Sequence, residues 1–262
     1  MGLLDGKVAL VSGAGPGLGR SVALALGSEG ASVAVAARTE SKVDAIAGEV
    51  RDGGAEALAV PLDVCDAGSC RQTVDRVVET FGRLDVVVNN AFHTGDFALF
   101  AEADLDSWRH TMDVNLFGTL QLTQAALGPL RKQGDGRIVM VNSMSSVRVQ
   151  PRFGAYAASK AALAAATKSL ALELGADGIR VNAIHPGYIW GDDVRAYFDM
   201  LAGSKGITSD EQYQEVASET ALGYLPDANE IAQAVVFFAS DMSKPVTGQA
   251  LGVNAGHWFQ GF

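Results

Sequence analysis

The fold is decided by one stretch near the start of the chain, Lys7-Val8-Ala9-Leu10-Val11-Ser12-Gly13-Ala14-Gly15-Pro16-Gly17-Leu18-Gly19. Its first part, 7–11, is an apolar run of the length of a buried strand. An amphipathic segment, 20–29, and a second apolar run, 32–37, follow the glycines. Strand, glycine turn, helix and strand in about 30 residues is typical of a dinucleotide-binding unit, whose glycines let the backbone approach a pyrophosphate. The alternative is a glycine-rich turn that binds no ligand.

The alternation of strands and helices continues along the rest of the chain. It predicts an α/β fold: a Rossmann-like, doubly wound parallel sheet of about seven strands with helices on both faces. No linker interrupts the pattern, so we expect residues 1–262 to form a single dinucleotide-binding and catalytic domain. The further helices are expected over 41–51, 68–81, 104–130, 152–174 and 229–240, and the further strands over 55–60, 84–88, 137–141, 179–184 and 250–253.

Charge and composition exclude several classes of partner. The 20 Lys and Arg residues against 30 Asp and Glu residues give a formal charge of −10, which argues against nucleic acid and against an anionic membrane surface. We find neither a signal peptide nor a run of 18 apolar residues, so we expect a cytoplasmic protein without a membrane span. Cys65 and Cys70 lack the spacing of a metal site, and we expect no metal and two reduced thiols, with a disulfide as the alternative.

Polar residues follow three successive strands of the predicted sheet. Arg38 follows the second strand, Asp63 the third and Asn89-Asn90 the fourth. Ligands of open α/β sheets bind at the carboxyl ends of the strands. Three polar strand ends beside one glycine loop therefore indicate a lined groove.

Tyr156 and Lys160 are the candidate chemical pair. They lie four residues apart in an alanine-rich segment with high helix propensity, so they share one helix face. A nearby ammonium stabilises a phenolate and lowers the tyrosine pKa, which suits proton exchange with an alcohol or a carbonyl. The alternative is an ordinary surface pair. Asn115, in the middle of a predicted helix, is a poor helix-interior residue and has either a buried structural role or a functional one.

Six motifs together resemble the short-chain dehydrogenase/reductase family, in its compact single-domain form. The motifs are the loop Ser12-Gly13-x-x-x-Gly17-x-Gly19, with Ser where Thr is usual; Asp63-Val64, similar to the pair that touches the adenine; Asn89-Asn90-Ala91, followed by Phe92 where a glycine is usual; Asn115, which matches the asparagine of the active-site tetrad; Ser143, Tyr156 and Lys160, with Ser143 13 residues before Tyr156; and Pro186-Gly187, similar to the turn beside the nicotinamide.

The resemblance implies a role for each member of the tetrad. Tyr156 would be the general acid/base, and Ser143 would hydrogen-bond the substrate oxygen. Lys160 would bind the nicotinamide ribose and lower the pKa of Tyr156, and Asn115 would hold a water that relays protons. Ser145 competes for the serine role. The implied cofactor-binding residues are Ser12, Gly13, Gly17, Leu18, Gly19, Arg38, Asp63, Val64, Asn90, Ala91, Tyr156, Lys160, Pro186, Gly187 and Ile189.

The second strand indicates which cofactor is used. An NAD site has an acidic residue at the end of this strand, but here Ala37 and Arg38 stand there. A guanidinium pairs well with a phosphate, so NADP is expected. Pro16 occupies the place where many NADP-dependent relatives have a second basic residue, which keeps NAD as the alternative.

A segment of about 187–226 is expected to form a helical lid over the strand ends. It carries six aromatic residues, which predicts a secondary alcohol or ketone on an apolar, cyclic skeleton. Arg148 and Arg152, close to the tetrad, could instead bind a carboxylate or sulfonate on the substrate. The alternative substrate is a sugar or polyol, with or without an anionic group. Two further interpretations stay open, a non-catalytic nucleotide sensor or scaffold and an epimerase or dehydratase. The substrate-binding candidates are Ser143, Tyr156, His93, Met144, Ser145 and Trp190.

The chain is also expected to assemble. The resemblance implies a homotetramer or a homodimer. The segment 253–262 carries three aromatic residues, Trp258, Phe259 and Phe262, which would be costly to expose in a monomer.

Overall fold

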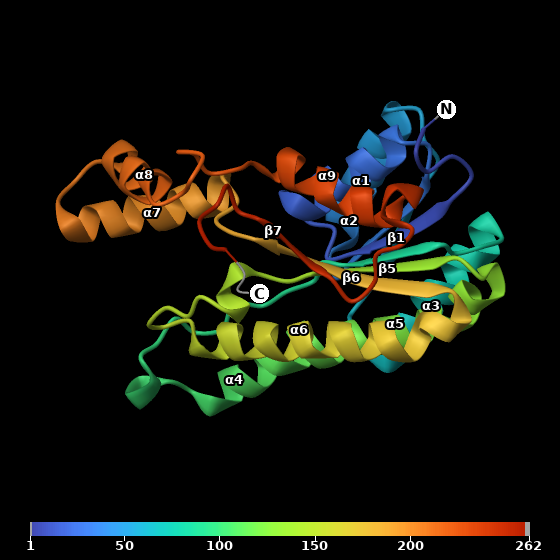
Figure 1. Ribbon diagram of the computed structural model, residues 1–262, viewed down its shortest axis with the longest axis horizontal. Coiled ribbons are helices and arrows are strands. Elements are labelled where there is room, and N and C mark those ends of the chain that lie inside the picture. The colour runs from blue at the N-terminus through green and yellow to red at the C-terminus, as the bar shows by residue number, and fades with distance from the viewer. Residues whose placement is uncertain (1, 260–262) are drawn as a thin grey trace.

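One parallel sheet forms the centre of the computed structural model, which describes residues 2–259 (Figure 1). Its strand order is β3-β2-β1-β4-β5-β6-β7, and every pairing is parallel. The predicted Rossmann-like sheet of seven strands is therefore confirmed. The chain reverses its direction of strand addition between β1 and β4, the place where such sheets bind ligands. The strands are β1 (Val8–Ser12), β2 (Ser32–Ala37), β3 (Ala57–Pro61), β4 (Val86–Asn89), β5 (Gly136–Val141), β6 (Ile179–Pro186) and β7 (Ala250–Val253).

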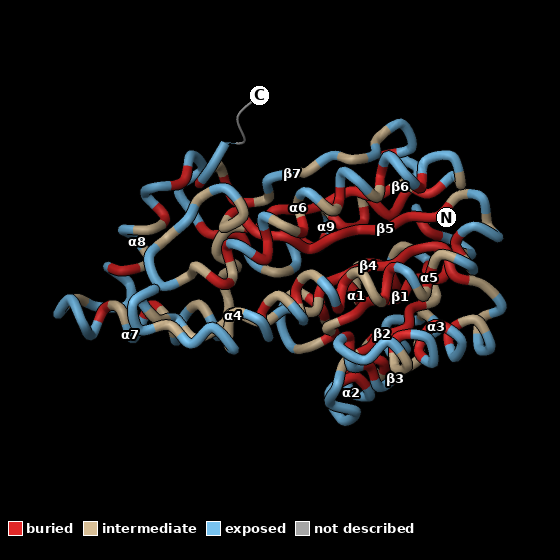
Figure 2. The backbone as a smooth tube through the Cα atoms, turned by 90° about the horizontal axis from the view of Figure 1, so that it is seen from below, coloured by how far each residue is buried: buried red, intermediate tan, exposed pale blue. Residues whose placement is uncertain are grey.

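Helices cover both faces of the sheet. Strand side chains alternate between the faces, as in β1, where Val11 packs toward one core cluster and Leu10 toward the other. Both faces of the inner strands are buried, which Figure 2 shows as a band of red through the sheet. The helices of the first face are α1 (Leu18–Ser28), α2 (Glu40–Asp52) and α9 (Ala228–Ala239), and those of the second are α3 (Ala67–Phe81), α5 (Thr119–Gln133) and α6 (Gly154–Leu174).

The helix expected over 104–130 is continuous but not uniform. It consists of α4 (Leu105–Met112), a π-helical turn, η2 (Asp113–Gly118), and α5. Asn115 lies inside the π-helical turn and is fully buried. The sequence marks this residue as a poor helix former, and the structure accommodates it by widening the helix locally.

The segment 187–226 is helical, as expected, and projects from one end of the sheet (Figure 1). It contains α7 (Asp192–Lys205) and α8 (Ser209–Ser218), which pack against each other. Short 3-10 turns elsewhere in the described chain are η1 (Phe100–Glu102), η3 (Met144–Ser146), η4 (Gly175–Asp177) and η5 (Asp241–Ser243).

Most element boundaries agree with expectation to within two residues. β4 begins at Val86 rather than at Leu84, and the buried carboxylate of Asp85 directly before it accepts from Val8 N–H and from Arg83. Cys65 and Cys70 are both free thiols, as expected, with Cys65 exposed and Cys70 buried. In the part of the chain that the structure describes, no helix combines the length and the apolar character needed to cross a bilayer.

Candidate active site

The glycine loop between β1 and α1 is tightly packed on its inner side and open on its outer side. Gly13 has a φ of +65°, and a Cβ there would lie 2.5 Å from the Cα of Ala91. A Cβ on Gly19 would lie 2.5 Å from the carbonyl oxygen of Gly13. Around Gly15 and Gly17, in contrast, a Cβ would meet nothing within 4 Å. The inner glycines bring the loop, α1 and the end of β4 together, and the outer ones leave the space that a pyrophosphate needs.

Ser12 and Asn90 lock this loop to the next strand. Asn90 N–H donates to Ser12 Oγ at 3.2 Å, and Asn90 Nδ2 donates to the carbonyl oxygen of Gly13 at 2.8 Å. Both residues were expected to bind cofactor. Their side chains bridge β1 and β4 and thereby set the shape of the loop.

A cleft of about 270 Å³ opens beside the glycine loop. Five residues expected from the sequence line it: Gly13, Arg38, Asp63, Val64 and Ala91. The expected Leu18 and Ile189 do not line it, because their side chains pack against the core. Lining residues that sequence reasoning did not assign are Ala14, Gly15, Ala37, Thr39, Lys42, Leu62, Cys65, Phe92, His110 and Val114.

Lys42 is the most informative of the unassigned residues. It lies in the first turns of α2, four residues after Arg38, and both side chains are exposed at the cleft. The cleft therefore has two cations on this side rather than one. The sequence feature that could have identified Lys42 is its position at the start of the helix that follows the second strand. Glu40 shares this turn but does not line the cleft.

Ser143 lies against Tyr156, which identifies the serine of the site. Its side chain hydrogen-bonds that of Tyr156. Ser143 Oγ also accepts from the N–H of Ser145 at 3.1 Å. Of the two candidate serines, geometry thus places Ser143 on the tyrosine, whereas Ser145 supports Ser143 through its backbone.

The electrostatics of the Tyr156 and Lys160 pair differ from expectation. Burial raises the pKa of Tyr156 to about 12, and the hydrogen bond from Ser143 opposes this only in part. Burial also lowers the pKa of Lys160 to about 7. Lys160 Nζ donates to Val141 O at 2.8 Å and lies 5.6 Å from the centre of the Tyr156 ring. In the protein alone, desolvation is the largest cause of both shifts, and the pKa of Tyr156 is raised rather than lowered.

Asn115 uses its side chain to hold the backbone around it. Its Oδ1 accepts from His93 N–H at 2.7 Å, and its Nδ2 donates to His93 O and to Ser159 Oγ, both at 2.8 Å. Ser159 Oγ donates in turn to Tyr156 O at 2.7 Å. The side chain of Asn115 thus joins the loop after β4 to the helix that carries Tyr156 and Lys160.

The remaining expected residues near the tetrad fall into two groups. Met144 and Gly187 approach each other and Asn254, since a Cβ on Gly187 would lie 2.9 Å from the Asn254 Cβ and 3.5 Å from the Met144 sulfur. Pro186 ends β6 directly before this contact. His93 packs its ring edge-on against His110, with centroids 4.8 Å apart, and its Nδ1 accepts from Gly95 N–H at 3.1 Å.

The side chain of Trp190 packs against other residues of the segment 187–226. Its ring centre lies 4.5 Å from that of Tyr213 and 4.6 Å from the guanidinium carbon of Arg195. A separate series of rings runs from the loop after β4 to this segment, with centroids 4.9 Å apart for Phe97 and Phe153 and 6.4 Å apart for Phe153 and Tyr197. Phe153 is the residue before α6, so these rings begin beside the helix that carries Tyr156 and Lys160.

Arg148 and Arg152, the residues expected to bind an anionic substrate group, have protein partners. Arg148 Nη2 donates to Glu219 Oε2 at 2.8 Å, and His257 Nε2 lies 3.1 Å from the same oxygen. Arg152 Nη1 contacts the carbonyl oxygen of Phe97 at 3.4 Å. The carboxylate of Glu219 thus connects the loop after β5, the end of α8 and the residues after β7.

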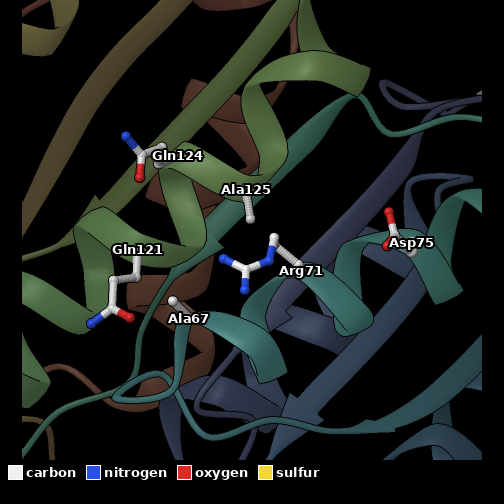
Figure 3. A pocket seen from close by; sticks show the side chains of 6 residues that line it. All are labelled: Ala67, Arg71, Asp75, Gln121, Gln124 and Ala125. Atoms are coloured by element: carbon white, nitrogen blue, oxygen red, sulfur yellow. The ribbon is translucent and has the colours of Figure 1, made fainter.

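A second hollow, of about 320 Å³, lies between α3 and α5 (Figure 3). Arg71 of α3 extends between the two helices, and none of the tetrad residues lines this hollow. Within residues 2–259, no group of three or more His, Cys, Asp or Glu side chains is arranged to hold a metal ion. The chemistry of the described residues therefore centres on the cleft and the tetrad.

Comparison with known proteins gives consistent matches over nearly the whole chain. Residues 13–257 match the family described as enoyl-(acyl carrier protein) reductase. A 3-oxoacyl-[acyl-carrier-protein] reductase from Staphylococcus aureus is 36% identical over 251 residues, which is 95% of this chain and 97% of the relative. NAD⁺-bound xylitol dehydrogenase is 32% identical, with a TM-score of 0.91 over 97% of this chain and 99% of that one. A variant of actinorhodin polyketide ketoreductase with NADPH is 32% identical, with a TM-score of 0.91 over 98% and 99% of the two chains.

Proposed function

Because the chain belongs to the short-chain dehydrogenase/reductase family, we propose that this oxidoreductase interconverts a secondary alcohol and a ketone with NADP. The observation that carries this proposal is the hydrogen-bonded pair of Ser143 and Tyr156, with Lys160 buried one helical turn away. When bound, the cofactor donates or accepts the hydride at the carbon of the substrate. The residues of the chain handle the proton at the oxygen.

Tyr156 acts as the proton donor to a ketone. With a pKa of about 12 it is protonated at neutral pH, so it holds the proton that the substrate oxygen takes up as the carbon accepts hydride. Ser143 donates a hydrogen bond to the same oxygen. Lys160, whose pKa burial lowers to about 7, can lose or take up a proton near neutral pH and is proposed to return one to Tyr156. In alcohol oxidation each transfer runs in reverse.

The cations of the β2–α2 turn support NADP over NAD. Arg38 and Lys42 line the cleft on one side of the glycine loop, and the hydroxyl of Thr39, at the N-cap of α2, makes no capping hydrogen bond. These groups suit a 2′-phosphate, which a carboxylate at Ala37 would repel. We expect kcat/KM to be higher with NADPH than with NADH. Arg38→Leu and Lys42→Leu should each lower the ratio of kcat/KM with NADPH to kcat/KM with NADH. A clear NAD preference in the unaltered protein would show that these cations bind no phosphate.

The substrate is proposed to be an apolar, cyclic alcohol or ketone. Support comes from the rings of Phe97, Phe153 and Tyr197 beside the catalytic helix. The segment 187–226 that carries Tyr197 is proposed as the lid of the site. The test compares kcat/KM for a cyclic terpene-type ketone with that for a sugar or polyol of similar size. A higher value for the polyol would overturn the apolar site and make Arg148 and Arg152 the first residues to mutate.

The reduction of a 3-oxoacyl thioester is the second candidate function. It rests on the name of the 36% identical relative from Staphylococcus aureus. A 3-oxoacyl thioester included in the same assay separates the two candidates, because only this activity requires the site to accept a linear acyl chain. A kcat/KM for the thioester above that for every cyclic ketone would favour the second candidate.

Residues 1–262 are proposed to act as one cytoplasmic domain that assembles into a homotetramer or homodimer. Trp258 is 40% and Phe259 is 74% exposed, which supports burial against another copy. Phe262, the third aromatic residue of this segment, lies outside the described residues. Light scattering would contradict the assembly if it gave the mass of one 27.3 kDa chain.

A further inference from the structure

Phe92 is a large apolar residue exposed inside the cleft. Its exposed fraction is 58%, and among residues 2–259 no other aromatic ring packs against it. It stands where a glycine is usual in the Asn-Asn-Ala-Gly motif, and its side chain lines the cleft. An exposed ring with no aromatic partner in a binding cleft calls for a ligand that covers it.

The backbone on both sides of Phe92 is held in place. Before it, Ala91 packs so closely on Gly13 that a Cβ on Gly13 would lie 2.5 Å from the Ala91 Cα. After it, His93 is bound through both its N–H and its C=O by the side chain of Asn115. The ring is thus carried by a fixed stretch of chain, so that binding a partner orders little besides its own rotamer.

The order of the strands fixes what the ring faces. β2 and β4 are the two neighbours of β1, so the residues that follow them flank the glycine loop on opposite sides. Phe92 follows β4, whereas Arg38 and Lys42 follow β2. Asp63 and Val64, after β3, line the same cleft. A ligand that enters the cleft therefore lies between Phe92, which follows β4, and Arg38 and Lys42, which follow β2.

We infer that Phe92 is a positioning residue for the adenosine part of the cofactor, and that its ring packs on this group from the side opposite Arg38. The inference rests on the proposed function, because it needs a nucleotide in the cleft. An aromatic ring stacks on any base, and such contacts are individually strong. A protein with glycine at this position would bind the same nucleotide without this contact. Phe92 therefore raises the affinity for the cofactor and leaves the reaction unchanged.

The test measures nucleotide binding by calorimetry, without turnover. The ligands are adenosine 2′,5′-bisphosphate, adenosine 5′-monophosphate and NADPH. The variants are Phe92→Leu, which keeps apolar bulk, and Phe92→Tyr, which keeps the ring. Phe100→Leu is the control, because Phe100 is 75% exposed on the same loop but does not line the cleft. Thermal unfolding verifies that each variant is folded.

Phe92→Leu is expected to raise Kd by at least about fivefold for NADPH and for the adenosine nucleotide that the protein binds. Phe92→Tyr and Phe100→Leu are expected to match the unaltered protein. Equal binding by Phe92→Leu overturns the inference and leaves the proposed function intact. A loss confined to NADPH also overturns it, because the ring then acts on the other half of the cofactor. If the unaltered protein binds none of the nucleotides, the proposed function itself fails.

Discussion

The cofactor cleft and the segment 187–226 are built in different ways. The cleft is made by the ends of adjacent parallel strands, and backbone contacts such as that of Gly13 with Ala91 fix its shape. The segment 187–226 consists of two helices packed on each other and is joined to the rest by aromatic rings and by the carboxylate of Glu219. Strand ends define the cleft through the backbone, whereas the segment is attached through side chains, and we expect the two regions to respond differently to mutation.

The largest effect of a mutation on activity is expected at the tetrad. Tyr156→Phe removes the proton donor and should lower kcat by roughly a hundredfold to ten-thousandfold. The Kd for NADPH should stay near that of the unaltered protein, because the cleft is unchanged. Turnover and calorimetry together check this, and near-normal turnover would contradict the role of Tyr156.

Two glycines of the loop should separate folding from binding. Gly13→Ala places a Cβ 2.5 Å from Ala91 at a φ of +65°, which should cost roughly 2 kcal/mol or more of unfolding free energy. Gly15→Ala meets open space and lines the cleft. It should leave the unfolding free energy unchanged to within about 0.5 kcal/mol and weaken cofactor binding. Denaturant unfolding and calorimetry measure the two effects, and equal stability of both variants would show that the loop relaxes.

Lys160 should give stability a distinctive pH dependence. The folded pKa of about 7 lies below the ordinary lysine value of 10.5, so between these values the unfolded chain binds more protons and the unfolding free energy rises with pH. Below about pH 7 the full cost of the buried ammonium is present. The pKa of neighbouring His185, lowered to about 4 by burial, keeps that residue neutral throughout this range.

Lys160→Met should therefore remove this rise. The difference in unfolding free energy between the unaltered protein and the variant should change by up to about 1.4 kcal/mol per pH unit above pH 7. Urea unfolding at pH 6, 7, 8 and 9 measures it. Parallel pH curves for the two proteins would mean that the folded pKa of Lys160 is not lowered.

The smallest effect on global stability is expected at the attachment of the segment 187–226. Glu219→Gln weakens the contacts with Arg148 and His257, and because Glu219 is half exposed the loss should be below about 1 kcal/mol. Amide hydrogen exchange should nevertheless quicken several-fold in α7 and α8 and stay unchanged in β1. Glu215→Gln is the control, since its partner Lys205 lies within the same segment. Equal exchange in both variants would show that Glu219 does not hold the segment.

The difference between the two regions also explains what the sequence could predict. The sheet and the glycine loop follow from local patterns, because each strand end is encoded by the residues next to it, whereas the contact of Ser143 with Tyr156 is implied by the family resemblance. Lys42 belongs to no motif and Phe92 departs from its motif, so only the folded chain shows that both line the cleft. The pairing of Arg148 with Glu219 spans 71 residues. The pKa values of Tyr156 and Lys160 depend on burial by the whole fold, which spacing along a helix does not reveal.

The cover of α1 by α9 sets the order in which this protein can be completed during synthesis. The two helices lie side by side against one face of the sheet, and Ser21 Oγ donates to Asn229 Oδ1 at 2.8 Å (Figure 1). More than 200 residues separate them in the chain. A growing chain that has emerged only as far as β6 already holds the strands of the cofactor cleft, but the apolar face of α1 lacks its cover. The nucleotide-binding unit that is translated first is thus among the last to be buried. A fragment that ends before α9 exposes the apolar face of α1.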